Sequence, residues 1–313
     1  MPKRRRDAAE LPPEGLLPPT ALVLTGGAVR SAFGAGVVKA LADLRLSDFS
    51  VAQAVSGGAP NLAYFAAGQH DELWSIWSGH IGTERFVDYR SLLRRPRAQA
   101  EAPLLNTHYL VDEVIAETVP LDTGRLASSS IRCRFLAARL EAGGLALASF
   151  GNDHPDLRAA LKACMALPSG APSPIGVADA RYVDGSLIDP IPFRWQDRPL
   201  ADRTLVVLNA PWKRNAVPAA RALEPLLFKG VFRRHPAIES AAQRRWSVDQ
   251  QTRRSLRAAE RRGEVLVVAP RRPTPASAIS RSSRRIRQTL EQGYREVMHR
   301  RAEIEDFLGR LVD

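Results

Sequence analysis

Hydrophobic residues occur in short runs that alternate with segments of helical spacing. Apolar runs at residues 21–24 and 51–55 each lead into a glycine-containing turn, which predicts buried strands of a parallel sheet. Residues 31–44 and 59–67, which follow these turns, have apolar positions at helical spacing. The pattern therefore predicts two successive strand–turn–helix units.

The same alternation continues to the C-terminus. Further strands are expected at residues 133–138, 145–150, 204–208 and 265–268, and further helices at 72–81, 109–117, 157–165, around 238–246 and at 286–311. Residues 90–103 are rich in Arg and Pro, which is typical of an insertion or a lid. Strands that alternate with helices predict an α/β sheet with helices packed on it.

The N-terminal segment differs from the rest of the chain. Residues 1–19 carry basic residues followed by prolines and contain no apolar core of a signal peptide, so we expect a flexible basic arm. We interpret residues 20–313 as one domain, with a motif-bearing core at 20–210 and a basic helical part at 211–313. No run approaches the roughly 18 apolar residues of a membrane-spanning helix, so any membrane contact is expected to be peripheral.

The charge of the chain is unevenly distributed. Residues 201–313 carry 24 Lys and Arg against 12 Asp and Glu, which accounts for the formal net charge of +12. Such a surface attracts anionic lipid headgroups, although solvated helix faces would have the same composition. Nucleic acid is an unlikely partner because aromatic residues do not alternate with the arginines. Cys133 and Cys164 lack metal-ligand spacing, and a cytoplasmic location fits them best.

A candidate nucleophile follows the second predicted strand. Ser56 lies in the segment Ala54-Val55-Ser56-Gly57-Gly58, which matches the nucleophile-elbow pattern G-x-S-x-G except for Ala54. Such an elbow places the hydroxyl at a sharp turn between strand and helix. A serine that caps the following helix is the more common reading of this pattern taken alone.

A glycine loop follows the first predicted strand. In the segment 25–30, Thr-Gly-Gly-Ala-Val-Arg, small residues could direct free backbone N–H groups at an oxyanion. The alternatives are a simple tight turn or a nucleotide-phosphate loop, but neither glycine pattern typical of nucleotide binding is present. A candidate base, Asp184, is followed by Gly185, and alone this pair would be typical of an ordinary turn.

Together, in this order, these segments resemble the patatin-like phospholipase family, whose pattern is G-G-G-x-R-G, then G-x-S-x-G, then D-G-G/A. Ala171-Pro172 and the D-P-I-P sequence that begins at Asp189 are also similar to the family, the latter to a bacterial branch of it. The resemblance covers residues 21–191 with motifs and, more loosely, later segments as far as residue 270.

The resemblance implies a fold and a catalytic dyad. The fold would be a three-layer α/β/α sandwich with a mostly parallel central sheet. Ser56 would form an acyl-enzyme, and Asp184 would act as general base without a histidine, which is chemically permissible if the two groups are within hydrogen-bonding reach. A Ser-His-Asp triad with His235 is the less favoured alternative. No metal and no other cofactor are expected.

The resemblance also implies the supporting residues of the site. Backbone groups of Gly26, Gly27 and Ala28 would form the oxyanion hole, and Arg30 would buttress this loop or reach a lipid phosphate. Ala54 and Gly58 would be the small residues of the elbow.

Four positions depart from the family pattern, because a small residue stands where a glycine is usual: Ala28, Ser31, Ala54 and Ser186. These substitutions carry a steric penalty only where the backbone needs a positive φ angle.

The predicted function is therefore that of a lipid acyl hydrolase that cleaves fatty acyl esters of a phospholipid or another lipid, with peripheral contact to an anionic membrane. The alternative is a catalytically impaired patatin fold that acts as a lipid-binding or regulatory module.

Overall fold

The computed structural model describes residues 19–93, 103–168, 170–212 and 235–309. Residues 1–18 of the predicted arm, and residues 94–102 of the predicted lid, lie outside the described residues. Within the described ranges no helix is long and apolar enough to cross a membrane.

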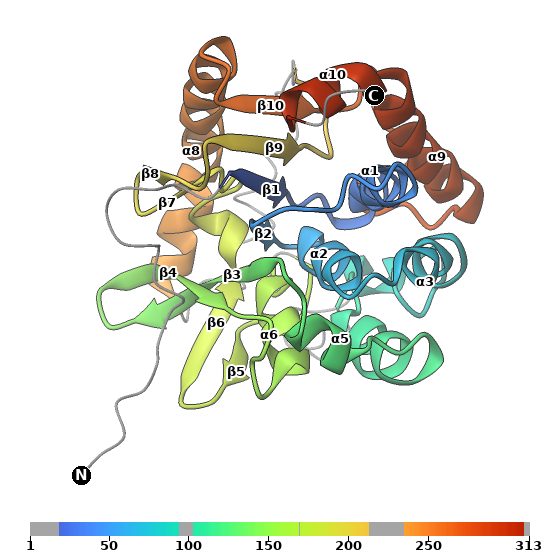
Figure 1. Cartoon of the computed structure of the whole chain (residues 1–313). Helices are drawn as coiled ribbons and strands as arrows, with labels where there is room; N and C mark the ends of the chain where they lie inside the picture. The colour runs from blue at the N-terminus through green and yellow to red at the C-terminus, as the bar shows by residue number, and fades with distance from the viewer. Residues whose placement is uncertain (1–18, 94–102, 169, 213–234, 310–313) are drawn as a thin grey trace.

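One sheet of eight strands forms the centre of the molecule (Figure 1), in the order β10-β9-β1-β2-β3-β6-β5, with β4 also paired to β3. The strands are β1 Thr20–Leu24, β2 Val51–Val55, β3 Arg132–Glu141, β4 Gly144–Phe150, β5 Ile175–Val177, β6 Ala180–Asp184, β9 Arg203–Val207 and β10 Val265–Val268. The run from β10 to β3 is parallel, whereas β4 and β6 lie antiparallel to β3. Strands β7 Arg194–Trp195 and β8 Arg198–Pro199 form a separate ribbon.

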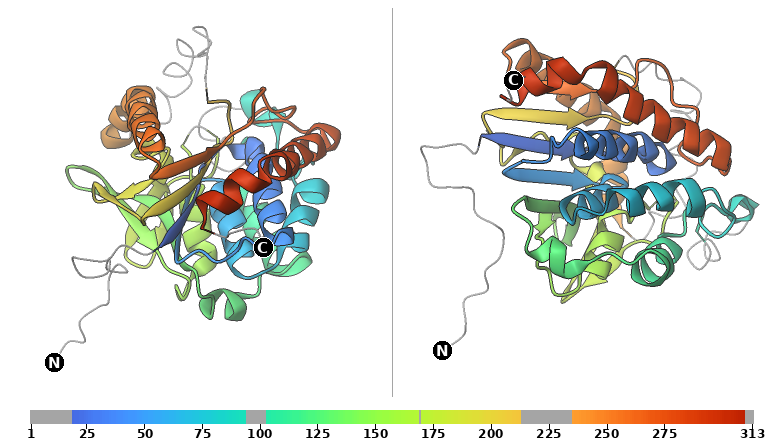
Figure 2. Two further views of the ribbon diagram at one scale, coloured as in Figure 1. Left: turned by 45° about the horizontal axis from the view of Figure 1, so that its top comes forward. Right: turned by 45° about the vertical axis from the view of Figure 1, so that its right-hand side comes forward.

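Helices cover both faces of this sheet. They are α1 Ala32–Asp43, α2 Gly58–Ala66, α3 His70–Ser75, α5 Thr123–Ala127, α6 Leu157–Cys164, α8 Pro236–Arg261, α9 Ser283–His299 and α10 Arg301–Phe307, with π-helical turns at Ile76–His80 and Tyr109–Thr118. Helices α1, α2 and α9 lie on one side of the sheet and α8 on the other (Figures 1 and 2). The predicted three-layer α/β/α sandwich with a mostly parallel sheet is thus confirmed.

The prediction of one terminal helix over residues 286–311 was wrong in one respect. The segment forms two helices, α9 and α10, which meet at Arg300, where φ of −111° and ψ of 19° leave the helical region. The Arg300 guanidinium donates a hydrogen bond to the Val267 carbonyl oxygen at 2.7 Å and pairs with Glu303. This contact with β10 anchors the break, which local helical spacing cannot reveal.

Helices α1 and α9 pack unusually closely. A Cβ atom added to Gly36 of α1 would lie 2.0 Å from the Leu290 carbonyl oxygen of α9, and one added to Gly293 would lie 2.0 Å from the Phe33 carbonyl oxygen. Each glycine therefore admits the backbone of the other helix. This reciprocal contact joins the C-terminal part of the chain to the first helix after β1.

The register of the sheet brings the candidate catalytic segments together. Leu24 of β1 is paired with Ala54 of β2, so the turns that follow these parallel strands lie side by side. Val55 is paired with Leu136 of β3, and the next residue of β3 is paired with Asp184. Strand β4 pairs with the opposite edge of β3, so β2 and β6 meet end to end along one edge of this strand.

Candidate active site

Ser56 occupies a sharp turn between β2 and α2. Its φ angle is +56°, a conformation that is uncommon for a residue with a side chain. Its side chain lines a pocket, as expected of a nucleophile elbow. A Cβ atom added to Gly26 would lie 2.5 Å from the Ser56 Cβ atom, so the glycine loop reaches the serine only because Gly26 has no side chain.

The two small elbow positions serve the packing of this turn. Ala54 is completely buried within β2. Gly58 is the first residue of α2, and a Cβ atom there would lie 2.5 Å from the Leu24 carbonyl oxygen. The helix therefore starts in contact with the end of β1.

Asp184 ends β6 and is fully buried. Its Oδ1 atom accepts a hydrogen bond from the Ser186 backbone N–H at 2.8 Å. Its Oδ2 atom is buried and makes no hydrogen bond of ordinary geometry. The Ser56 hydroxyl lies near enough to the Asp184 carboxylate to lower its pKa. Because Oδ1 already accepts a hydrogen bond, Oδ2 is the oxygen that is available to accept the Ser56 proton.

Burial raises the pKa of Asp184 above its ordinary value. The Ser56 hydroxyl, the Ser186 N–H and the charge of Arg245 act in the opposite direction. A carboxylate that has lost its water is a stronger base than one in solvent, which suits general-base catalysis near neutral pH. Asp189, five residues later, is also affected by burial, which raises its pKa to about 6.

The glycine loop presents unused donors beside Ser56. Within the described part of the chain, the N–H groups of Gly26, Gly27 and Ala28 donate to no protein acceptor, and the same holds for Gly57. All four residues line the pocket, as does Arg30. These amides could stabilise an oxyanion, and Gly57 is a donor that the sequence analysis did not single out.

Two asparagine residues hold this loop in place. Asn209 accepts a hydrogen bond from the Gly34 N–H at 2.9 Å and donates to the Thr25 carbonyl oxygen at 2.7 Å. Asn61 donates to the Ser31 carbonyl oxygen at 2.9 Å. These contacts link residues far apart in the chain. The sequence analysis assigned no role to either asparagine, because no local pattern marks such a contact.

Of the four departures from the glycine pattern, only Ala28 has a positive φ angle, +51°. Ser31 has φ of −65°, while Ala54 and Ser186 are absent from the residues with positive φ. The left-handed region costs a residue with a Cβ atom roughly 1–2 kcal/mol. The penalty of the altered pattern is therefore confined to one position in the oxyanion loop.

We expect Ala28→Gly to stabilise the folded protein by roughly 0.5–1 kcal/mol, because the relief of this strain exceeds the entropic cost of glycine. Chemical denaturation of the variant and the wild type measures the difference. Ala54→Gly is the matched control and should destabilise, because it removes a buried methyl group from a strand whose φ needs no glycine. Equal destabilisation of both variants would contradict this account.

None of the six histidines, all of which are described, lines the pocket. His235 is the residue that precedes α8. The geometry therefore gives no support to the triad alternative.

The pocket next to Ser56 has a volume of about 550 Å³. One part of its wall is apolar and includes Trp77, Phe86, Leu105, Leu110, Met165 and Leu167. Another part is formed by α8, and most of its residues there are polar or charged. A cavity with an apolar wall and a polar wall around a serine hydroxyl suits an amphipathic ester.

Comparison with known proteins gives the family. A family model described as "Patatin-like phospholipase" matches residues 22–194, more than half of the chain. The chain belongs to the patatin-like phospholipase family. Patatin-like phospholipases are lipid acyl hydrolases, and the matched range contains both Ser56 and Asp184.

A second family model, described as "Domain of unknown function (DUF6363)", matches residues 235–309. This range holds α8, β10, α9 and α10, so it supplies one strand to the patatin sheet and helices to both of its faces. No curated protein sequence matches the chain. Among solved structures, VipD from Legionella pneumophila is similar with a TM-score of 0.48 and 13% identity, over 93% of this chain and 66% of VipD.

Proposed function

We propose that this patatin-like protein is a serine acyl hydrolase that cleaves fatty acyl esters of lipids through Ser56 and Asp184. The observation that carries the proposal is the approach of the Ser56 hydroxyl to a buried carboxylate with a free Oδ2 atom, beside four unused backbone donors. The apolar wall of the pocket supports an acyl chain as the group that is bound.

The reaction follows from this geometry in two steps. Asp184 accepts the Ser56 proton while Oγ attacks the ester carbonyl carbon, and the amides of the glycine loop stabilise the negative oxygen that forms. The carbon–oxygen bond of the ester then breaks, and the alcohol leaves with the proton held by Asp184. Water, deprotonated by Asp184, next attacks the acyl-enzyme, and the fatty acid departs as Ser56 regains its proton.

The test is a pair of measurements on purified protein. A fluorophosphonate probe is expected to label one serine, identified by mass spectrometry in the peptide that contains Ser56, and the protein should release fatty acid from phospholipid vesicles. If the protein binds vesicles but is neither labelled nor active, the impaired lipid-binding module becomes the better description. Labelling at another serine would overturn the assignment.

A rim with apolar, aromatic and cationic groups adjoins the pocket. Ile279 lines the pocket and is 37% exposed, and its carbonyl oxygen accepts a hydrogen bond from the Tyr89 hydroxyl at 2.7 Å. The Arg281 guanidinium lies over the Tyr89 ring, 4.8 Å from its centroid. An exposed apolar residue, an aromatic residue with a polar end and a cation are the groups that bind a lipid–water interface. We propose that this rim docks on an anionic bilayer.

Ile279→Asp is expected to weaken binding to anionic vesicles about 10-fold, since it replaces an apolar contact with the bilayer by a negative charge that the anionic surface repels. Vesicle co-sedimentation measures this, and wild-type binding should fall as salt rises. Met298→Asp is the matched control, because Met298 is similarly exposed, at 41%, but does not line the pocket. The docking proposal would be contradicted if vesicle binding did not depend on salt concentration, or if it fell equally in both variants.

A further inference from the structure

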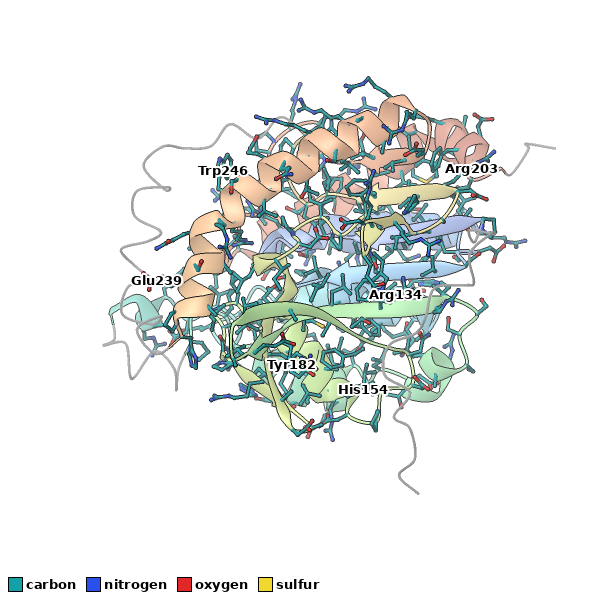
Figure 3. The ribbon with its side chains drawn as sticks, turned by 90° about the vertical axis from the view of Figure 1, so that its left-hand side faces the viewer. Arg134, His154, Tyr182, Arg203, Glu239 and Trp246 are labelled. Atoms are coloured by element: carbon teal, nitrogen blue, oxygen red, sulfur yellow. The ribbon has the colours of Figure 1, made fainter. Side chains whose placement is uncertain are left out.

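Helix α8, which lies within the segment of unknown function, forms one wall of the catalytic pocket. Its pocket-lining residues are Glu239, Ala242, Gln243, Arg245, Trp246, Asp249 and Arg253. They extend over about 21 Å of helix at 1.5 Å per residue. Figure 3 shows α8 across this side of the molecule, with Glu239 near its start and Trp246 further along. The pocket is thus shared between the patatin core and the C-terminal segment.

The two arginines of this wall differ in their bonding. Arg253 is buried, and its Nε atom donates to the Asp249 carboxylate at 2.9 Å in a buried ion pair. Arg245 is partly buried and forms no ion pair with any described residue. Its one hydrogen bond within the described residues is a long contact of 3.4 Å from Nη2 to the Ser186 hydroxyl. The ion pair holds Arg253 in place, although its buried Nη1 atom makes no hydrogen bond within the described residues, whereas Arg245 has no ion pair there and most of its N–H donors are uncommitted.

Arg245 is placed next to the reacting groups. Ser186, which it contacts, donates its backbone N–H to Asp184 at 2.8 Å. A guanidinium carries five N–H donors in a planar fork that matches the oxygens of a phosphate. In a phospholipid or a lysophospholipid, a glycerol unit separates the phosphate from the acyl ester. An ester carbonyl at Ser56 would therefore place a phosphate within reach of a residue just beyond Asp184.

We infer that Arg245 binds the phosphate of the substrate, so that α8 gives the hydrolase a preference for phosphate-bearing acyl esters over neutral acylglycerols. The inference rests on the proposed function and names its substrate class. In this interpretation, the segment of unknown function completes the acyl hydrolase pocket and recognises the headgroup of the substrate.

The experiment compares two substrates with the same acyl chain, 1-oleoyl lysophosphatidic acid and 1-oleoylglycerol, in neutral detergent micelles that carry no surface charge. Arg245→Gln removes the charge and keeps a donor for Ser186. We expect it to lower kcat/KM for the lysophospholipid about 10- to 100-fold more than for the acylglycerol, because a charge-assisted bidentate contact is lost. Any effect of Arg245 on Asp184 applies to both substrates and cancels in this ratio.

Arg244→Gln is the matched control, because Arg244 precedes Arg245 on α8, is exposed and does not line the pocket. In this control variant, the ratio of kcat/KM for the lysophospholipid to kcat/KM for the acylglycerol should equal that of the wild type. An equal loss on both substrates in Arg245→Gln would show that Arg245 acts through Asp184 and would overturn the inference. Wild-type kcat/KM on both substrates would also overturn it.

Binding measured in the Ser56→Ala background separates this inference from the proposed function. Titration calorimetry should show tighter binding of lysophosphatidic acid than of 1-oleoylglycerol, and Arg245→Gln should abolish the difference even if the wild type proves inactive. If inorganic phosphate alone binds as tightly as the lysophospholipid, and with the same dependence on Arg245, the site is one for free phosphate. That outcome would refute a headgroup subsite.

Discussion

Asp184→Asn is expected to lower fatty-acid release about 10²- to 10⁴-fold, the range that a positioned general base contributes. Asparagine keeps the acceptor for the Ser186 N–H, but it cannot take the Ser56 proton. Ser56→Ala should reduce turnover to the background rate, because no nucleophile remains at the elbow. Release of fatty acid from mixed phospholipid vesicles, with a p-nitrophenyl acyl ester alongside, measures both variants.

Asp189→Asn is the matched control for the first variant. Asp189 is also an aspartate whose pKa burial raises, to about 6, but it does not line the pocket. Its replacement should leave turnover within a few-fold of the wild type. If Asp184→Asn keeps wild-type activity, or if both variants lose it equally while folded, Asp184 is not the base.

The pH dependence follows from the sign of the shift. Asp184 must be deprotonated to act, so activity should rise with pH through a pKa that burial has moved upward. Because the folded-state pKa is raised, the folded protein binds this proton more tightly than the unfolded chain, and the ionised carboxylate lowers stability above that pKa. Asp184→Asn should consequently be at least as stable as the wild type at neutral pH, which keeps a loss of activity separate from unfolding.

Gly293→Ala is expected to destabilise the protein by about 3 kcal/mol or more, because the added methyl group would lie 2.0 Å from the Phe33 carbonyl oxygen. The neighbouring atom belongs to the backbone, so no side-chain rotation can relieve the overlap. Gly36→Ala should have a similar effect from the other side of the same contact. Denaturant unfolding, followed by circular dichroism, measures the loss.

Gly79→Ala provides the control, since a Cβ atom there meets nothing within 4 Å. Its unfolding free energy should change by less than about 0.5 kcal/mol. If Gly293→Ala were equally harmless, α1 and α9 would be free to separate at little cost. The close packing of the C-terminal segment on the patatin core would then not contribute to stability.

Local patterns in the chain were sufficient to place most of the elements and to indicate the family. Short apolar runs and helical spacing depend on a few neighbouring residues, so β1, β2, α1 and α2 could be placed from the chain alone. The elbow around Ser56 and the glycine loop were visible for the same reason, because turn chemistry is local. The roles of Ser56 and Asp184 stay predictions, although the structure brings the two residues together.

The surroundings of that pair depend on contacts between distant parts of the chain. The approach of Asp184 to Ser56 depends on β3, which is paired with both β2 and β6, and sheet order is not encoded in local spacing. The positive φ angle of Ala28 could not be assigned from its side chain. Arg245 reaches Ser186 across 59 positions of the chain. Its charge looked like part of a solvated basic helix because burial and partners arise only when α8 packs against the sheet.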